Sequence, residues 1–376
     1  MSSRSLQDII DSYGSALPLR EASTIPAEWY IDGRIAELEQ QSVFGRTWQM
    51  VGRAEQVANP GQFITTEIAG EPIVVIRGKD GVLRAFFNVC RHHAAAVVTE
   101  PCGHARVLRC PYHGWSYGTD GALQTAPEFE EVKNFSKQQN GLITVRVEVW
   151  EKFVFVNLDA DAQPLRDFLK TFVDRVAPLE INGLNFFESR SYTLKCNWKV
   201  FVDNYLDGGY HVPHLHKGLN SVLQYAQYKI EEEGNYCVQS SPMRNAAEDA
   251  SVAATRKGDF TYYLWLYPNF MLNWYEGVMD TNLVLPIDVD HTKVIFNFYF
   301  TDVDEAYAPA NRKSVDVSER IQNEDVGICE SVQRGLKSRA YGAGRLSVRR
   351  ESGEHLFHRL LYADLKKGLG RASAAR

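Results

Sequence analysis

The sequence predicts an α+β protein in which a small all-β domain precedes a larger domain built from an antiparallel sheet with flanking helices. Three segments of the 376-residue chain lead to this prediction. Residues 61–88 alternate apolar and polar side chains around a Lys-Asp-Gly turn, which is typical of a β-hairpin. Residues 262–277 have the composition of two aromatic strands separated by a Pro-Asn interruption. Residues 354–370 repeat leucine near helical spacing, which predicts a closing amphipathic helix.

These segments divide the chain into three regions. We expect an N-terminal helical segment at residues 1–44 that packs on the larger domain, the small β-domain at residues 45–157, and the larger α+β domain at residues 158–376. A chain of this length can bury more than one hydrophobic core. His355 and His358 share one face of the closing helix, and we expect them at its surface or at an interface.

The composition excludes several classes of protein. With 44% hydrophobic and 23% charged residues, the chain has the composition of an ordinary globular protein. Its formal net charge of −6 argues against a nucleic-acid-binding protein. No apolar run reaches about 18 residues, so no transmembrane helix is expected. Six cysteines are too sparse for a disulfide scaffold, and the N-terminus resembles neither a secretory signal nor a transit peptide. We therefore expect a cytoplasmic protein.

Cysteine and histidine crowd together in residues 90–115. They form two arms, Cys90-Arg-His92 and Cys110-Pro-Tyr-His113, which are separated by 17 residues. A zinc finger groups its two cysteines and its two histidines apart. Here each arm offers one thiolate and one imidazole, which suits a two-iron cluster with two thiolates on one iron and two imidazoles on the other. A structural zinc site is the alternative, and Cys102 with His104 lies too close to the second arm to compete.

A second group of histidines follows in the segment NWKVFVDNYLDGGYHVPHLHKGL, residues 197–219. Residues 203–216 of this segment contain two acids, an amide and three histidines: Asp203, Asn204, Asp207, His211, His214 and His216. The pattern predicts a helix from Trp198 that loosens at Gly208-Gly209 and at Pro213. The alternative is a polar helix end in which the histidines cluster by chance.

The two Cys-His arms, followed by Gly114-Trp115, resemble the Rieske domain of the Rieske-type non-heme iron oxygenases. The resemblance extends over residues 29–370 and implies a [2Fe–2S] Rieske cluster. Such clusters have reduction potentials of roughly −150 to +300 mV. The resemblance assigns four cluster ligands: Cys90, His92, Cys110 and His113. Many relatives have Arg-Gly after the first histidine, where this chain has His93-Ala94, and we expect His93 to face away from the cluster.

The resemblance also implies a mononuclear Fe(II) site held by two histidines and one carboxylate. The family spaces its iron histidines as H-x4-H, which only His211 and His216 satisfy, so His214 falls outside the ligand set. The family takes the third ligand from an acidic dipeptide ahead of a helical run, here Glu324-Asp325, and we assign Asp325 with Glu324 as the alternative. Three ligands on one side leave positions open for O2 and substrate.

Three further stretches resemble the choline monooxygenase branch: DNYLDGGYHVPHLHKGL, YPNFMLNWYEGVMDTNLVLP and EDVGICESVQRGL. Many oxygenases have a carboxylate three residues before the first iron histidine that bridges the two metal centres, but here that residue is Gly208. We assign the bridge to Asp207, with Asn204 beside it as a catalytic residue and Asp203 as the alternative. Because electrons pass between subunits in relatives of this kind, the resemblance implies a homotrimer.

The aromatic stretch offers candidate substrate contacts. A quaternary ammonium has no N–H donor, and aromatic faces bind it through cation–π attraction. The candidates are Trp265, Tyr267, Trp274 and Tyr275. The alternative is that these rings fill the sheet core. Plant choline monooxygenases have a basic residue near the position of Trp274. This difference leaves open the alternative that the chain acts on a compound related to choline.

The resemblance implies a terminal oxygenase that hydroxylates or oxidatively N-demethylates a small choline- or betaine-like compound with O2 and electrons from NAD(P)H. The chain has neither a plant-type ferredoxin spacing nor a G-x-G-x-x-G fingerprint, so we expect a separate flavin/iron–sulfur reductase. One alternative is an oxygenase acting on aromatic rings or aromatic acids. A weaker alternative is a Rieske electron-transfer protein, which would need no second metal site.

Overall fold

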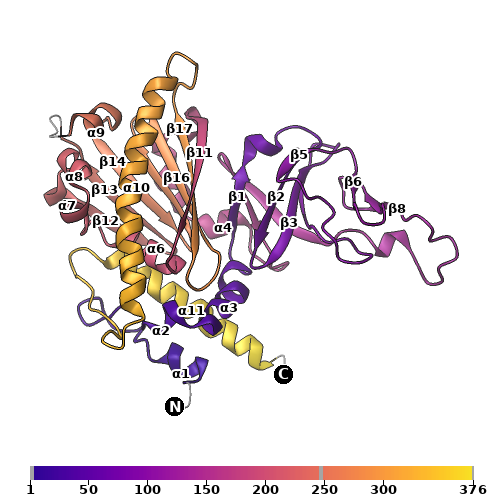
Figure 1. Ribbon diagram of the computed structural model, residues 1–376, viewed down its shortest axis with the longest axis horizontal. Coiled ribbons are helices and arrows are strands. Elements are labelled where there is room, and N and C mark those ends of the chain that lie inside the picture. The colour runs from indigo at the N-terminus through magenta and orange to yellow at the C-terminus, as the bar shows by residue number, and fades with distance from the viewer. Residues whose placement is uncertain (1–3, 245–248, 375–376) are drawn as a thin grey trace. The chain divides into compact units, whose positions relative to one another are not determined.

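The computed structural model describes residues 4–244 and 249–374. By their internal contacts, these residues form two compact units, one of residues 40–170 and the other of residues 1–39 together with 171–376. The predicted α+β class is confirmed, since each unit contains a seven-stranded antiparallel sheet (Figure 1). The domain boundaries predicted from the sequence fall after residues 44 and 157, whereas those of the structure fall after residues 39 and 170. The N-terminal segment belongs to the same unit as the larger domain.

The smaller unit is a β-domain. Its large sheet has the order β1-β10-β9-β4-β3-β2-β5, and β6-β7-β8 form a three-stranded sheet. The strands are β1 (Gln49–Arg53), β2 (Gln62–Ile68), β3 (Glu71–Arg77), β4 (Leu83–Phe87), β5 (Cys102–His104), β6 (Leu108–Arg109), β7 (Ser116–Tyr117), β8 (Leu123–Thr125), β9 (Thr144–Trp150) and β10 (Phe153–Asn157). Four short helices accompany them: η1 (Gln40–Phe44), η2 (Ala54–Val57), η3 (Lys137–Gln139) and α4 (Leu165–Leu169).

The predicted hairpin corresponds to β2, β3 and β4, which pair in sequence. Gly81 forms the expected turn between β3 and β4 at φ +79°, a conformation that glycine adopts without steric cost. The Asp80 side chain accepts the backbone N–H of Val82 and pairs with Arg84 at 2.7 Å, which closes the turn. Strand β3 lies inside the sheet, between β4 and β2, and its inner residues are buried on both faces.

The larger unit is built on one antiparallel sheet of the order β11-β17-β16-β15-β14-β13-β12. Its strands are β11 (Asn185–Leu194), β12 (Lys229–Glu233), β13 (Tyr236–Pro242), β14 (Phe260–Leu266), β15 (Phe270–Tyr275), β16 (Val278–Pro286) and β17 (Thr292–Phe300). The two aromatic strands expected from the sequence are β14 and β15, and they pair with each other directly.

Helices cover this sheet, and the long α10 crosses it in the view of Figure 1. The helices are α1 (Leu6–Asp11), α2 (Glu28–Ile31), α3 (Gly33–Glu39), α5 (Phe172–Val176), η4 (Ala177–Leu179), η5 (Ile181–Gly183), α6 (Trp198–Leu206), α7 (Val212–Leu215), α8 (Lys217–Val222), η6 (Tyr225–Gln227), α9 (Ala250–Thr255), α10 (Ala308–Leu336) and α11 (Ser352–Ala374). The predicted closing helix is α11, which buries Phe357, Leu361 and Leu365 completely. No helix among the described residues is both long and apolar enough to cross a membrane.

Helix α6 is fixed at its start by polar contacts inside the core. The Asn197 side chain caps the helix by accepting the backbone N–H of Lys199. The ammonium of Lys199 and the indole N–H of Trp198 both donate to the buried carboxylate of Glu39, at 2.7 and 2.8 Å. Breaking such a buried pair by removing one partner is strongly destabilising. These bonds attach α3 to α6 and thereby fix the helix that leads into the histidine segment.

Candidate metal centres

The two Cys-His arms fold as a pair of loops with the same backbone bond. The carbonyl of Cys90 accepts the N–H of Ala94 at 3.0 Å, and the carbonyl of Cys110 accepts the N–H of Gly114 at 3.1 Å. Both residues that close the loops have positive φ, 61° at Ala94 and 73° at Gly114. Only glycine adopts this conformation without strain, so Ala94 stands at the loop position where relatives carry glycine.

Within the smaller unit, the loops bring two thiols and two imidazoles together. Cys90 and Cys110 are free cysteines with 3% and 2% exposure, and the rings of His92 and His113 lie 4.7 Å apart. Burial raises the pKa of the Cys110 thiol, and neighbouring Cys90 adds to this rise. A buried thiolate therefore needs a cation beside it, and a coordinating metal supplies one.

The imidazoles support the same interpretation. The Nδ1 atom of His92 is buried and has no hydrogen-bond partner among the described residues. Trp115 stacks on the His92 ring at 4.9 Å with an interplanar angle of 2°, which fixes the ring's orientation. Two buried thiols and an unpartnered buried nitrogen form a donor set that fits a [2Fe–2S] Rieske cluster.

The ring of His93, which we expect to face away from the cluster, is exposed and lies 4.0 Å from the ring of His92 and 5.4 Å from that of His113. The sequence reasoning missed Tyr117, whose hydroxyl accepts the N–H of Arg91 and lies 3.4 Å from the sulfur of Cys90.

In the larger unit, a glycine turn positions the second histidine group. Helix α6 ends at Leu206, and Gly208 and Gly209 follow with φ of 66° and 67°. A Cβ atom on Gly208 would lie 2.0 Å from the carbonyl oxygen of Arg350, so no side chain fits there. The turn leads into α7, at whose start His211 stands. This crowding explains why the position that carries a carboxylate in many oxygenases is glycine in this chain.

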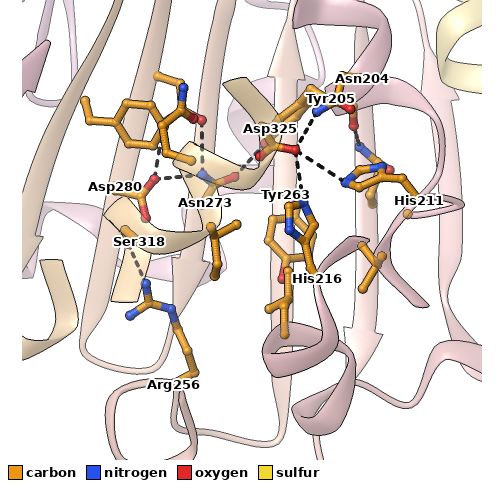
Figure 2. A pocket seen from close by; sticks show the side chains of 18 of the residues that line it. Asn204, Tyr205, His211, His216, Arg256, Tyr263, Asn273, Asp280, Ser318 and Asp325 are labelled. Carbon is orange, nitrogen blue, oxygen red and sulfur yellow. Dashed lines mark hydrogen bonds and ion pairs between the residues drawn. The ribbon is translucent and has the colours of Figure 1, made fainter. Parts of the chain in front are cut away.

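The structure brings His211 and His216 together with Asp325 of α10. The three residues offer ligand atoms that all lie within 4.8 Å of one another. The Nε2 atom of His216 lies 3.0 Å from Oδ1 of Asp325, and Nε2 of His211 lies 3.9 Å from the same oxygen (Figure 2). His214 is exposed and outside this group. Two imidazoles and one carboxylate on one side of a cavity fit a mononuclear iron site.

Each of these three side chains has a polar partner behind it. Nδ1 of His211 lies 2.6 Å from Oδ2 of Asp207, and Nδ1 of His216 lies 2.6 Å from Oε2 of Glu324. The amide of Asn204 donates to Oδ1 of Asp325 at 2.9 Å. Carboxylates that accept the Nδ1 protons leave both Nε2 atoms free for a metal. This geometry favours Asp325 over Glu324 as the third ligand and gives Glu324 an orienting role.

The pKa of His216 reflects this surrounding. Burial disfavours the charged imidazolium, but the hydrogen bonds to Asp325 and Glu324 outweigh burial and raise the pKa. The two carboxylates beside His216 therefore favour a positive charge at this position.

Asp203, the alternative bridge, is engaged elsewhere. Its Oδ2 accepts the hydroxyl of Tyr30 at 2.5 Å, and its Oδ1 lies 3.0 Å from Nε2 of His358. Burial, followed by repulsion from Asp203 and Glu351, raises the pKa of the neighbouring Glu354 well above its usual range. His358 is fully buried, which corrects the expectation of a surface position, and His355 is buried too. Asp207, not Asp203, contacts His211.

A cavity of about 110 Å³ opens beside the triad. Six aromatic rings line it: Phe201, Tyr205, Tyr228, Tyr263, Tyr275 and Phe296. Burial raises the pKa of the Tyr205, Tyr228 and Tyr263 phenols, so they stay neutral. Two charged residues, Arg256 and Asp280, also line the cavity. Neutral phenol faces can surround a compact organic cation.

Of the four rings proposed as substrate contacts, only Tyr275 lines this cavity, and the structure corrects the other three positions. The indole of Trp265 is fully buried and donates to the carbonyl of Pro268, and the hydroxyl of Tyr267 donates to Asp364. Trp274 donates to the carbonyl of Leu179. Side chains alternate along a strand, so Trp274 faces away from the cavity that its neighbour Tyr275 lines.

Sequence reasoning missed most of the cavity. Its residues come from separate strands and helices, and one signal could have identified part of it. In β16, Asp280 and Asn282 stand two residues apart, on either side of Thr281, and the rest of the strand is apolar. Buried polar residues at alternate positions of a strand indicate that one face lines a polar site.

Comparison with known proteins gives consistent matches. The model of the ring hydroxylating alpha subunit catalytic domain matches residues 181–366, and the model of the Rieske [2Fe-2S] domain matches residues 47–136. Choline monooxygenase, chloroplastic, of Arabidopsis thaliana is 38% identical over 96% of this chain and 87% of its own. The carnitine monooxygenase oxygenase subunit of Escherichia coli (strain K12) is 34% identical over 91% of this chain and 94% of its own.

A solved structure matches as well. It belongs to a quaternary ammonium Rieske monooxygenase that was described in connection with carnitine oxidation and inter-subunit electron transfer. The two chains share 31% identity with a TM-score of 0.84, over 93% of this chain and 97% of the other.

Proposed function

Because the chain belongs to the Rieske non-heme iron oxygenases, whose enzymes combine a [2Fe–2S] Rieske cluster with a mononuclear iron, we propose that its substrate is a small quaternary ammonium compound. The reaction is hydroxylation or oxidative N-demethylation of that compound. One observation carries the proposal: four tyrosine rings line the cavity beside the His-His-Asp triad. Two relatives named as choline and carnitine monooxygenases support it.

The cavity fits a quaternary ammonium, whose charge is permanent, because it offers aromatic faces and a carboxyl group and not hydrogen-bond acceptors alone. Each cation–π contact contributes about 0.5–2 kcal/mol. The hydroxyls of Tyr263 and Tyr275 bond to each other at 2.8 Å, and that of Tyr205 donates to Asn273 at 2.8 Å. These bonds satisfy the polar ends of the rings and hold their faces in position.

The residues around the triad prepare the reaction. Cys90, His92, Cys110 and His113 would hold the Rieske cluster, and His211, His216 and Asp325 would hold the iron. When bound, the cluster supplies stored electrons and the iron activates O2. Asp207 and Glu324 keep the Nδ1 protons on the two iron histidines, and Asn204 orients the Asp325 carboxylate. The tyrosine rings exclude water and hold the substrate's reacting carbon near the triad.

Further parts of the proposal concern assembly and setting. Asp207 links the two metal centres, its second partner being a histidine of the cluster. The oxygenase works as a homotrimer in the cytoplasm and receives electrons from NAD(P)H through a separate flavin/iron–sulfur reductase. The solved relative described with inter-subunit electron transfer supports the oligomeric part. The sparse cysteines support the cytoplasmic setting.

Oxygen uptake by the reconstituted holoenzyme with a surrogate reductase tests the substrate class. Choline, carboxybetaines and aromatic acids form the panel, and 3,3-dimethylbutanol is the neutral control with the shape of choline. We expect product-coupled uptake with quaternary ammonium compounds and none with the neutral control. Equal turnover of the control, or turnover of aromatic acids alone, would overturn the proposal. The aromatic alternative fits less well because the buried carboxylate of Asp280 would face a neutral ring.

A further inference from the structure

Arg256 places a positive charge in the wall of the substrate cavity. It follows α9 directly, lines the cavity and is only 4% exposed. Its guanidinium donates to the hydroxyls of Ser314 and Ser318 on α10, at 2.6 and 2.5 Å, and lies 4.9 Å from the ring centre of Tyr275. Figure 2 shows Arg256 and Ser318 on the side of the cavity away from His211.

Among the residues that the structure describes, this charge has no direct counter-ion. Within residues 4–244 and 249–374, no carboxylate lies within 4 Å of the guanidinium, and its side-chain partners are neutral hydroxyls. Its other acceptor is the carbonyl of Thr255, at 3.4 Å. A guanidinium has five N–H donors in a planar fork, so donors remain for a further acceptor. A buried charge without an ion partner is costly, which a protein can offset by binding an anion there.

The cavity also has a negative pole. Asp280 is 4% exposed, and its Oδ2 accepts the amides of Asn273 and Asn282 at 2.7 and 3.3 Å. Burial raises the pKa of Asp280, and the positive charge of Arg256 opposes this rise. The cavity thus combines a guanidinium, a carboxyl group that accepts two amide N–H bonds, and aromatic faces. That combination is complementary to a zwitterion.

We propose that Arg256 binds the carboxylate of the substrate, so that this enzyme acts on a carboxybetaine, a compound with a quaternary ammonium and a carboxylate. The proposal rests on the proposed function and narrows it. An Arg–carboxylate pair is bidentate and strong, and it sets one end of the ligand while the tyrosine rings hold the ammonium. Choline would bring a second cation into the cavity and leave Arg256 without an anion.

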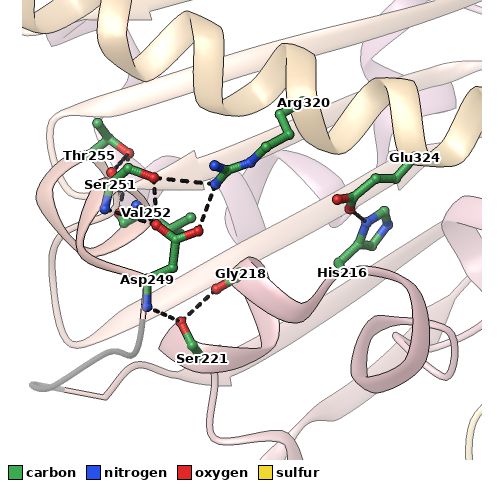
Figure 3. A network of polar contacts seen from close by, with 9 residues as sticks. All are labelled: His216, Gly218, Ser221, Asp249, Ser251, Val252, Thr255, Arg320 and Glu324. Carbon is green, nitrogen blue, oxygen red and sulfur yellow. Dashed lines mark hydrogen bonds and ion pairs between the residues drawn. The ribbon is translucent and has the colours of Figure 1, made fainter.

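The protein fixes Arg256 in advance. Asp249 caps α9 by accepting the N–H groups of Ser251 and Val252, and Arg320 of α10 donates to Asp249 at 2.9 Å (Figure 3). This pair is partly exposed and contributes little to stability, whereas Ser314 and Ser318 contact the guanidinium directly and orient it. Arg320 does not line the cavity. It therefore offers a matched control: another arginine between the same two helices, outside the binding site.

Steady-state kinetics of the holoenzyme with glycine betaine, γ-butyrobetaine and choline test the proposal. The wild type should prefer at least one carboxybetaine over choline in kcat/KM. Arg256→Met should lower kcat/KM for that carboxybetaine about 100-fold, mostly through KM, and change choline turnover little. For Arg256→Lys, kcat/KM with the carboxybetaine should lie between the values of the wild type and of Arg256→Met. Lysine keeps the positive charge but lacks the planar guanidinium that binds a carboxylate through two hydrogen bonds. Arg320→Met should leave the carboxybetaine-to-choline ratio unchanged.

Contrary results separate the two proposals. If Arg256→Met lowers kcat/KM equally for the carboxybetaine and for choline, the role of Arg256 is structural and the inference fails. The same holds if Arg320→Met changes the carboxybetaine-to-choline ratio of kcat/KM as much as Arg256→Met does. If the wild type turns over choline but no carboxybetaine, the inference fails while the proposed function stands. If no quaternary ammonium compound is turned over, the proposed function itself fails. Should Arg256→Met not fold, thermal shifts of the wild type decide: at equal concentration, carboxybetaines should raise Tm more than choline does.

Discussion

At the scale of single residues, Asp207 holds the segment that carries His211. Its Oδ2 lies 2.6 Å from Nδ1 of His211 and also accepts the backbone N–H of that residue at 3.0 Å, while its Oδ1 accepts the N–H of Tyr210. The carboxylate thus fixes both the ring and the backbone of an iron ligand. Charge-assisted bonds of this kind are stronger than bonds between neutral groups.

We predict that Asp207→Asn keeps both metal centres but slows electron transfer roughly 10- to 100-fold, because the amide keeps the shape and loses the charge. Iron content and single-turnover oxidation of the pre-reduced Rieske centre, with substrate and O2 present, measure the two effects. Asp203→Asn is the control, since Asp203 bonds to Tyr30 and His358 instead. Wild-type rates and full product yield in Asp207→Asn would show that Asp207 is not the bridge.

At the scale of elements, the turn between α6 and α7 decides where the iron ligands stand. Gly208 combines a φ of 66° with a carbonyl oxygen of Arg350 only 2.0 Å from where a Cβ would be. Gly208→Asp would restore a carboxylate three residues before His211, but the side chain has no space. The backbone must move, and His211 moves with it.

We therefore predict that Gly208→Ala and Gly208→Asp lower the free energy of unfolding by about 1–3 kcal/mol and lose mononuclear iron. The absorption of the Rieske cluster should persist. Chemical denaturation and iron analysis give the readouts. Gly327→Ala is the control, because Gly327 lies in α10 with no atom within 4 Å of an added Cβ, and it should stabilise by about 0.5–1 kcal/mol. Full iron occupancy in Gly208→Asp would contradict this account of the turn.

At the scale of the whole molecule, each candidate metal centre lies within one compact unit. The Cys-His loops belong to residues 40–170, and the triad belongs to the unit of residues 1–39 and 171–376. The donor atoms of one site therefore do not depend on the side chains of the other.

This separation predicts that each site can be emptied alone. His211→Ala should lose the mononuclear iron and keep the Rieske spectrum, whereas His113→Ala should lose the Rieske spectrum and keep the mononuclear iron. Neither variant should turn over substrate, since the reaction needs both centres. Total iron, acid-labile sulfide and ultraviolet–visible spectra distinguish the two losses. Loss of both metals from either purified, folded variant would mean that the sites form cooperatively.

Much of the fold and of the metal ligands follows from the sequence alone. The Cys-x-His and Cys-x-x-His arms lie in short loops whose backbone bonds are local, so spacing suffices to predict that the side chains within each arm lie close together. The H-x4-H pair lies within one turn and short helix, and the strands around residues 61–88 and 262–277 follow from alternation. Asp325, 109 residues after His216, came from family resemblance and not from any local pattern.

Only the tertiary structure decided which side chains reach the substrate. Trp265 and Tyr275 have similar composition around them, yet one fills the core and the other lines the cavity. His358 has the spacing of a surface residue on α11 but is buried against Asp203. Arg256 and Asp280 meet in one cavity because an antiparallel sheet and α10 bring distant segments together. Sequence determines which face a residue takes on its own element, whereas packing between elements determines what that face contacts.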